Sequence, residues 1–385
     1  PSTAYTVSGT TITFTSAPPA GTSNVYARYM STATQTITPS PGTVGTSQLS
    51  PSLTNVPFFG GSTIGAGNAT GMKNRIINGG MVLDQYNAGA SVSLSGTGQH
   101  IVDRMKCRLD ASSSSTGQQV ADAPVGFNNS IKLTIGTGAA PSSSQLGWLG
   151  QSIEGFNTAD LGWGTSSAKT VTLSFWVKSS VTGTFSGAVR NGGTSAYVFG
   201  YAVSSANTWE RKTVTIIGDT ANTWGTGNGL GVGVFFDLGT GTTYQAAAGA
   251  WSSGNYFSAS GSTAICATSG ATFYVTGVQL EEGNAATSFE FVDYGRLLQQ
   301  CQRYFEVGRL YGSAYFQNSS TNTLDRFEAT YCFKQTKRTS PTVISTNIGS
   351  GTIATQVVDV DAAAFRRTGI FDSPLNITLT ASSEL

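Results

Sequence analysis

The chain has 385 residues, a formal net charge of +1 and only 11% charged residues, with 48 glycines and many Ser and Thr residues. A nearly neutral chain lacks the electrostatic field that gathers nucleic acid or an anionic membrane surface. No apolar run approaches the roughly 20 residues of a membrane-spanning helix. We therefore expect no nucleic-acid partner and no membrane insertion, and an all-β chain whose length allows two or three domains.

The first 30 residues predict a β hairpin followed by a linker or an extended arm over residues 31–72. The arm is rich in Thr, Ser, Pro and Gly and buries little apolar surface alone. The apolar cluster at 56–59 favours an extended arm that becomes ordered by packing against neighbouring subunits. Apolar residues of the hairpin region alternate at Tyr5, Val7, Ile12 and Phe14, with a turn at 18–21, and continue at Val25, Ala27 and Tyr29.

Residues 73–292 predict a two-sheet β sandwich, since short strands recur between Gly, Ser and Asn turns. A helical connector follows at 293–306, where Asp293 is expected to cap the helix and Leu297 and Cys301 to share one face. A small β domain follows at 307–385. The predicted strands are 130–135, 169–178, 184–188, 197–203, 209–217, 229–237 and 271–280, then 310–317, 325–333, 342–346, 353–360 and 375–379.

Several ordered motifs support a family resemblance. The sequence carries RIINGGM at 75–81, HIVDRM at 100–105, VQLEEG at 278–283, ATSFE at 286–290 and CQRYF at 301–305. Together they closely resemble the jelly-roll, carbohydrate-module-like domain of bacteriophage tail fibre proteins. Met105 departs from the pattern, because an aromatic residue usually follows the Asp-Arg pair there.

Two shorter stretches extend this resemblance. Residues 5–29 are similar to the end of the tail-attachment domain of short-tailed phage fibres. The RTSPTV run at 338–343 resembles the Arg-x-x-Pro-Thr-Val pattern of the terminal β domain of such fibres. Because the chain begins at Pro1 without Met, we expect it to be part of a longer protein whose N-terminal portion attaches to the virion.

The resemblance implies a jelly-roll β sandwich followed by a small C-terminal β domain, with a short N-terminal hairpin and linker. It also implies a homotrimer located in the virion tail, in contact with tail adaptor or nozzle proteins. Oligomer contacts would complete the core of the small distal domain. The expected function is attachment to a host surface glycan such as lipopolysaccharide. An adaptor or decoration fibre without receptor binding is the first alternative, and a glycan depolymerase or esterase is the second.

The sequence gives little support for a cofactor site or a nucleophilic catalytic residue. Cys107, Cys266, Cys301 and Cys332 are widely spaced, and His100 is the only histidine. Zinc sites need clustered ligands and redox motifs need a close Cys pair, so buried free thiols and no cofactor are expected. A structural calcium ion is compatible with a sandwich module of this type, but no DxDxDG loop assigns one.

Catalysis by acidic residues is also not expected. Glycan depolymerases cut with two carboxylates held roughly 5–10 Å apart, and none of the acidic pairs lies in a context that predicts convergence. Asp103 and Arg104 look like a structural pair, and His100 like a locally hydrogen-bonded histidine. The pairs are Glu154 with Asp160, Glu281 with Glu282, and Asp359 with Asp361.

Aromatic residues supply the glycan-binding candidates. Exposed aromatic faces stack on the apolar C–H groups of sugar rings, while polar neighbours bind the hydroxyls. Trp176 and Trp209 lie in apolar strands and are expected in the core. The remaining tryptophans lie among Gly, Ser, Thr or Asn, and the alternative is that they only anchor long loops. The candidates are Trp148, Trp163, Trp224, Tyr244 and Trp251.

Overall fold

The structure is a computed structural model that describes residues 5–17, 20–21, 72–312, 326–347, 352–368 and 375–385. The chain divides into two compact units, residues 1–59 and 60–385. In the first unit, β1 (Tyr5–Ser8) pairs with β2 (Thr11–Phe14) in an antiparallel hairpin. The turn therefore lies at residues 9–10. The single strand expected across 5–14 is therefore two strands, while the expected turn at 18–21 lies partly outside the described residues, and Val25, Ala27, Tyr29 and the arm at 31–71 lie wholly outside them.

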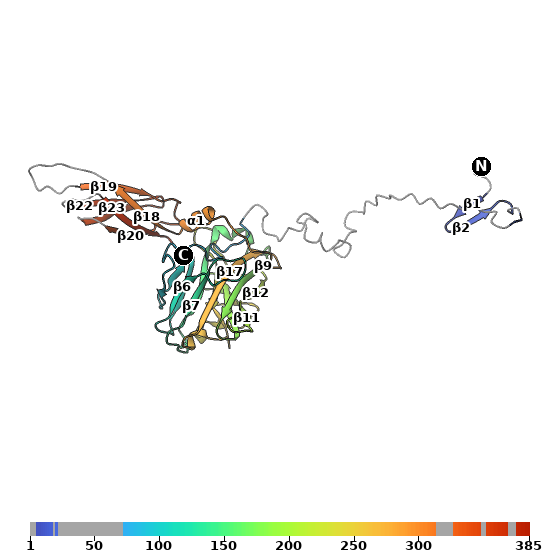
Figure 1. The fold of residues 1–385 in the computed structure, drawn as a ribbon, viewed down its shortest axis with the longest axis horizontal. Coiled ribbons are helices and arrows are strands. Elements are labelled where there is room, and N and C mark those ends of the chain that lie inside the picture. The colour runs from blue at the N-terminus through green and yellow to red at the C-terminus, as the bar shows by residue number, and fades with distance from the viewer. Residues whose placement is uncertain (1–4, 18–19, 22–71, 313–325, 348–351, 369–374) are drawn as a thin grey trace, which may run out of the picture. The chain divides into compact units, whose positions relative to one another are not determined.

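The second unit contains a jelly-roll β sandwich. Figure 1 shows β6, β7, β17, β9 and β12 of one sheet side by side. Within the described ranges, the first sheet has seven strands in the order β15 (Trp251–Ser253), β11 (Ser195–Val203), β10 (Gly183–Arg190), β13 (Leu230–Asp237), β8 (Gly147–Glu154), β5 (Met105–Leu109) and β4 (Gln99–Val102). The second has six, in the order β12 (Glu210–Ile216), β9 (Val171–Ser179), β17 (Thr272–Glu282), β7 (Ser130–Thr134), β6 (Thr116–Val120) and β3 (Val92–Ser93).

Short elements connect these strands. They are the 3-10 turns η2 (Gly155–Asn157), η3 (Ala159–Leu161), η4 (Thr242–Tyr244) and η5 (Ile265–Ala267), and the small parallel pair β14 (Gln245–Ala246) and β16 (Ser258–Ala259).

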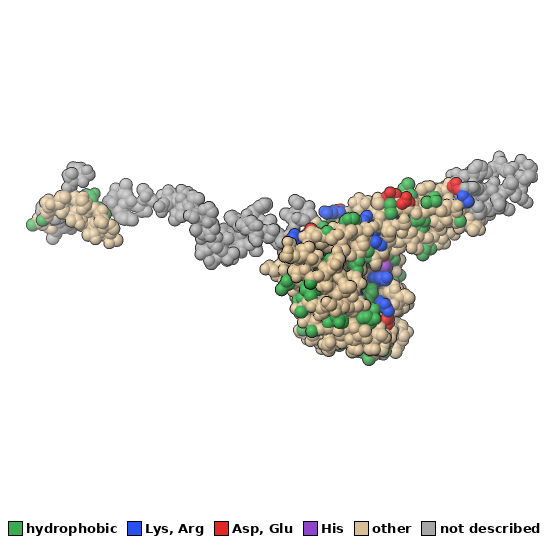
Figure 2. Space-filling model, turned by 180° about the vertical axis from the view of Figure 1, so that it is seen from behind, with side chains coloured by type: hydrophobic (Ala, Val, Ile, Leu, Met, Phe, Trp, Pro, Cys, Tyr) green, Lys and Arg blue, Asp and Glu red, His purple; other side chains and the backbone are tan. Residues whose placement is uncertain are grey.

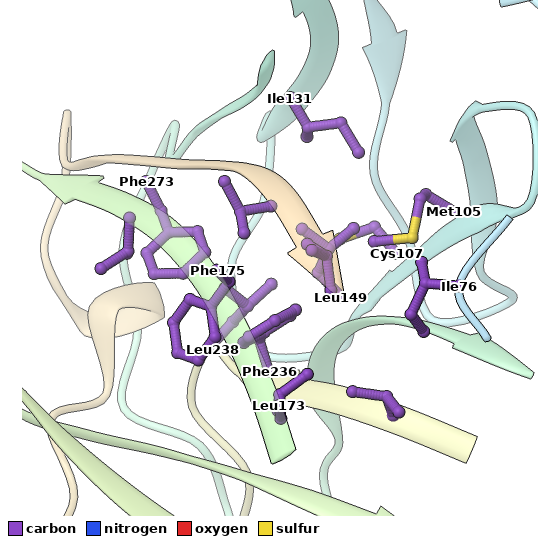
Figure 3. Close-up of a cluster of buried hydrophobic side chains, with 14 of the residues drawn as sticks. Ile76, Met105, Cys107, Ile131, Leu149, Leu173, Phe175, Phe236, Leu238 and Phe273 are labelled. Carbon is purple, nitrogen blue, oxygen red and sulfur yellow. The ribbon is translucent and has the colours of Figure 1, made fainter. Parts of the chain in front are cut away.

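The sandwich core lies between the two sheets (Figure 3). Side chains alternate across a strand, so every second residue of β9 points inward. Leu173 and Phe175 of β9 meet Phe236 of β13, with ring centroids of Phe175 and Phe236 4.8 Å apart. A register shift in β17 between Thr276 and Gln279 bends that strand against β9.

The connector forms as expected. Helix α1 (Tyr294–Gln302) begins after Asp293, whose side chain accepts a hydrogen bond from the Arg296 backbone N–H at 3.0 Å. Its buried face carries Leu297 and Cys301, which pack with Tyr304 in a cluster separate from the sandwich core. The helix therefore connects the end of the sandwich to the following domain.

The C-terminal part forms two small antiparallel sheets around a core that includes Tyr331, Phe365 and Leu379. In the described residues the sheets run β18 (Phe305–Gly312), β23 (Leu375–Ser382), β20 (Thr342–Asn347) and β19 (Arg326–Cys332), β22 (Ala362–Thr368), β21 (Thr352–Val358).

A buried ion pair fixes the start of this domain. Lys337 Nζ lies 2.6 Å from Glu306 Oε2, and both side chains are fully excluded from solvent. The Tyr331 hydroxyl donates to Glu306 Oε1 at 2.7 Å, and Lys337 also donates to the Gln302 backbone carbonyl. The carboxylate and the ammonium therefore replace their lost water with partners inside the protein.

Polar contacts also join this domain to the sandwich. Arg338 Nε donates to the Ser383 carbonyl at 2.8 Å, and its Nη1 donates to the Asn228 carbonyl at 3.0 Å. Arg303 donates to the buried Glu154 carboxylate. The end of the chain is thus held against the sandwich.

Most predicted strands of the sandwich are present within a few residues, but some elements were not predicted. Strand β8 was not predicted, because its Gly, Gln and Ser residues hide an apolar alternation. Strand β22, which is rich in Ala and Arg, was not predicted either. Trp176 and Trp209 are half-buried on the outer side of their sheet rather than in the core. Cys107, Cys266 and Cys301 are buried free thiols as predicted, whereas Cys332 is exposed.

We predict that Lys337→Met lowers the free energy of unfolding of the C-terminal domain by about 3–5 kcal/mol, since it leaves the Glu306 charge buried and unpaired. Urea titration followed by hydrogen exchange of β18 and β23 measures this change. The control is Arg366→Ala, which removes a half-exposed ion pair with Glu328 and is expected to cost less than about 1 kcal/mol. Equal losses of unfolding free energy in the two variants would contradict the stabilising role assigned to the buried Lys337–Glu306 pair.

Candidate functional site

The outer face of the seven-stranded sheet is built by strand alternation in β8. Leu149 and Ile153 of β8 are buried in the core, so Trp148, Gly150 and Ser152 face outward. In the antiparallel register with β13, Trp148 lies opposite Asp237, and Gly150 lies opposite Phe235. Directly opposed residues share a face, so Trp148 and Phe235 lie on the same outer surface.

Two glycines make room for the Phe235 ring. A Cβ added to Gly150 would lie 2.4 Å from Phe235 Cδ1, and one added to Gly233 would lie 2.5 Å from Phe235 Cε2. Real Cβ atoms do not approach that closely, so the ring lies across the sheet only because neither position carries a side chain. Phe235 thereby forms the floor of an aromatic surface.

Phe257 is brought over this floor by a buried carboxylate. Asp237 accepts hydrogen bonds from Ser258 Oγ at 2.9 Å and Ser262 Oγ at 3.0 Å. Burial raises the pKa of Asp237, while these hydroxyls and the Gly239 amide favour its charged form. The segment that follows Phe257 is therefore tied to the sheet.

The aromatic cluster consists of Trp148, Phe235, Phe257 and Tyr244. The Trp148 and Phe257 rings are nearly parallel, with centroids 6.1 Å apart, and Trp148 meets Phe235 edge to face at 5.0 Å. The ring centroids of Tyr244, in η4, and Phe257 are 6.4 Å apart. Phe235 and Phe257 are buried, whereas Trp148 and Tyr244 are half-buried. Trp148 and Tyr244, two of the five predicted aromatic residues, therefore lie in one cluster and are partly exposed.

A pocket of about 270 Å³ adjoins this cluster. That volume is close to the lower end of small-ligand pockets, roughly 300–1,000 Å³. Another pocket of about 300 Å³ lies beside Arg303, but its Glu154 and Arg303 side chains are already paired with each other. A third, beside Phe289, holds only about 110 Å³. The first is lined by His100, Arg104, Lys106, Trp148, Gly150, Ser152, Arg190, Phe235, Phe257, Glu384 and Leu385.

Cations surround the aromatic surface. Arg190 lies with its guanidinium carbon 4.0 Å from the Phe257 ring centroid, and it donates a hydrogen bond to Asn255. Desolvation lowers the pKa of Arg190 to about 10. Arg104 is buried and donates to both the Glu384 carboxylate and the Ser152 carbonyl. Figure 2 shows several Lys and Arg side chains along one edge of the larger body.

His100 borders the pocket as a neutral side chain. Its ring stacks on Tyr86 at 4.5 Å, and burial, with Lys106 and Arg104 nearby, lowers its pKa to about 3. The Glu384 carboxylate lies 3.8 Å from His100 Nε2, but it is already bound by Arg104. His100 is thus held by ring stacking rather than by the local hydrogen bonds expected from the sequence.

The remaining three predicted aromatic residues are core residues or pack on the core. Trp163, Trp224 and Trp251 contact one another edge to face at 4.7–5.4 Å. Trp163 and Trp224 are 7% and 8% exposed. Their indole N–H groups donate to Lys169 and to Asp219, respectively. The expectation of exposed rings is therefore wrong for Trp163 and Trp224, which anchor loops to the core, whereas Trp251 is half-buried and packs on the core.

The predicted acidic pairs have structural partners. Glu154 is bound by Arg303 and Tyr304, Asp160 by Arg75, and Glu282 by Lys169. Asp103 is held by Gln85 and not by Arg104, so the expected Asp103–Arg104 pair is wrong.

The described residues offer neither a metal-binding cluster nor a helix that could cross a bilayer. In the part of the chain that the structure describes, no group of three or more His, Cys, Asp or Glu side chains is placed to hold a metal ion. No helix within the described ranges has the length and apolarity needed to cross a bilayer.

Most of the residues around Trp148 could not be predicted from local sequence patterns. Arg190, Phe235 and Phe257 come from strands and loops far apart in sequence, and Glu384 comes from the other domain. Only the alternation of β8 could have marked Trp148 as facing outward. The pairing of β8 with β13, which brings Phe235 beside Trp148, has no local sequence signal.

The comparisons with known proteins give only distant similarities. No protein-family model matches the sequence, and no curated protein matches it. The enzymatically active domain of bacteriophage CBA120 tailspike protein 4 is 14% identical, with a TM-score of 0.32 over 55% of this chain and 21% of that one. This chain therefore spans about a fifth of that structure's length.

Two other solved structures show similar values. A CBM4 structure is 16% identical, with a TM-score of 0.28 over 54% of this chain and 98% of that one. A Bacteroides thetaiotaomicron protein described as sugar-binding is 11% identical, with a TM-score of 0.30 over 55% of this chain and 100% of that one. At these values the similarity assigns neither a family nor a function to the chain.

We predict that Trp163→Ala lowers the free energy of unfolding by about 3–5 kcal/mol, because it empties a buried ring site. Trp148→Ala is expected to cost clearly less, since that ring is only half-buried. Thermal unfolding followed by circular dichroism compares the two. A larger loss for Trp148→Ala would show that the core and surface roles are reversed.

We predict that the His100 imidazole stays neutral from neutral pH down to about pH 4, because its folded pKa lies far below the ordinary value near 6.5. The unfolded chain binds this proton more readily, so the His100 contribution to stability is present above about pH 6.5 and is lost as pH falls toward 3. Titration of the single histidine by NMR tests this, and a midpoint near 6.5 would contradict it.

Proposed function

We propose that this protein is a phage tail fibre component that binds a host surface glycan non-covalently through the pocket beside Trp148. The observation that carries the glycan-binding part is the Trp148 ring, half-buried beside Phe235 and Phe257 at the edge of a pocket of about 270 Å³. A sugar ring places its apolar C–H face on such a surface, and its hydroxyls require polar neighbours. Arg104, Lys106 and Ser152 line the same pocket.

The Trp148 side chain supplies a further reason for this choice. Its indole Nε1 is buried and has no hydrogen-bond partner among the described residues. Buried indole donors usually find a partner, as those of Trp163 and Trp224 do here. Trp148 lines the pocket, and its indole donor, unlike those of Trp163 and Trp224, has no partner in the part of the chain that the structure describes.

The tail-fibre part of the proposal is supported by the motifs at 75–81, 278–283 and 301–305. In such a particle, weak individual sites hold strongly because many copies bind one surface together. We propose a homotrimer attached to tail adaptor or nozzle proteins, and a role in binding rather than cleavage. The acidic pairs considered for cleavage are engaged by Arg, Lys, hydroxyl or backbone N–H partners where the structure describes them.

The function is tested by adsorption of the labelled protein to bacterial cells, before and after oxidation of surface glycans with periodate. We expect adsorption to susceptible cells that periodate removes. Adsorption that survives periodate would indicate a protein receptor, and no adsorption to cells that the phage infects would contradict receptor binding. Release of reducing ends from the purified glycan would show that the protein is an enzyme.

We predict that Trp148→Ala reduces glycan binding roughly 5- to 150-fold, taking the roughly 1–3 kcal/mol that stacking of a nucleic-acid base on an aromatic ring contributes as the scale for a sugar ring. The matched control is Trp209→Ala, which removes another half-buried tryptophan on the outer side of the six-stranded sheet. Isothermal titration with the purified glycan measures both variants. Equal affinity of wild type and Trp148→Ala would exclude this face as the site.

A further inference from the structure

We propose that the sugar bound beside Trp148 is acidic, and that Arg190 and Lys106 bind its carboxylate or phosphate group. This inference rests on the proposed function, because it names the class of glycan that the same pocket accepts. It depends on charges that the fold leaves without a counter-ion at this pocket.

Arg190 is the first of these charges. The residue is 7% exposed, and no carboxylate of the described residues lies within 4.0 Å of its nitrogen atoms. Its described hydrogen bond goes to the neutral Asn255 side chain, and its Nε atom has no partner there. The Asn255 side chain and the Phe257 ring replace part of the hydration that the buried guanidinium loses, but no opposite charge does.

Other buried cations in this protein are paired with carboxylates. Lys337 is paired with Glu306, Arg75 with Asp160, and Arg104 with Glu384. Each cation therefore has a carboxylate within ion-pair distance. Arg190 departs from that pattern, and it does so at the wall of a pocket large enough for a ligand.

Lys106 is the second charge. It follows Met105 in β5, faces outward, and lies opposite Gly150 in the register of β5 with β8. Its aliphatic stem passes close over Gly98. No ion pair of Lys106 is found among the residues that the structure describes, so its ammonium group is available at the pocket.

The acidic groups nearby do not neutralise these two cations. Glu384 is bound by Arg104, and Asp237 accepts from serine hydroxyls. Asp110 is held by Arg108 through two hydrogen bonds of 2.8 and 2.9 Å. Among the side chains that line the pocket, three are cationic and one, Glu384, is a carboxylate that Arg104 already binds, while His100 is neutral.

An acidic sugar fits this arrangement chemically. Its ring would lie on the half-buried Trp148, and its anionic oxygens would accept hydrogen bonds from the guanidinium and the ammonium. Charge-assisted bonds of this kind are roughly twice as strong as neutral ones, and they are stronger still where water is partly excluded. A neutral sugar would leave the Arg190 guanidinium without an opposite charge.

The test uses the full chain and three probes, glucuronate, glucose phosphate and glucose, at one ionic strength. The readout is the indole N–H signal of Trp148 in a two-dimensional NMR spectrum, assigned with Trp148→Phe. We expect both acidic sugars to shift this signal at concentrations at least about tenfold lower than glucose does. The two acidic probes distinguish a carboxylate site from a phosphate site.

Lys106→Ala tests the cation without removing the buried Arg190 side chain. We expect this variant to lose most of the preference for the acidic sugars, while Lys132→Ala, on the other sheet, keeps it. Equal response to glucose and glucuronate in the wild type would overturn the acidic-sugar inference and leave glycan binding intact. No response of Trp148 to any of the three sugars would contradict both proposals.

Discussion

The two-residue period of strand β8 is the constraint on which the rest of this site depends. Leu149 and Ile153 must enter the core, so Trp148, Gly150 and Ser152 must face outward. A shift of one residue would bury the tryptophan and expose the leucine. The position of Trp148 at the pocket is therefore fixed by the same apolar burial that holds the two sheets together.

A second constraint acts on charge. Burying an ion is costly unless a partner replaces its hydration, and most buried charges in the described part of the chain have such a partner. The pairs Glu306–Lys337 and Glu154–Arg303 hold the C-terminal domain and helix α1 in place. Arg190 has only a neutral hydrogen-bond partner and the Phe257 ring, and we propose that an anionic ligand completes this position.

The sequence predicted the elements better than it predicted the site. Local signals gave the strands of β9 and β17 and the Asp293 cap, because alternation and capping depend on near neighbours. The same reasoning placed Trp163 and Trp224 in exposed loops, since Gly and Ser around them hide a buried tryptophan cluster. Arg190, Phe257 and Glu384 meet only through strand pairing and domain contact, which no local pattern encodes.

The central claim is that Trp148 and Arg190 bind one sugar together. A crystal structure of the full chain with an acidic oligosaccharide that binds in solution tests it most directly. We expect a sugar ring against Trp148 with its anionic group within hydrogen-bond distance of Arg190 or Lys106. A sugar bound elsewhere, with the Trp148 pocket empty, would contradict the account.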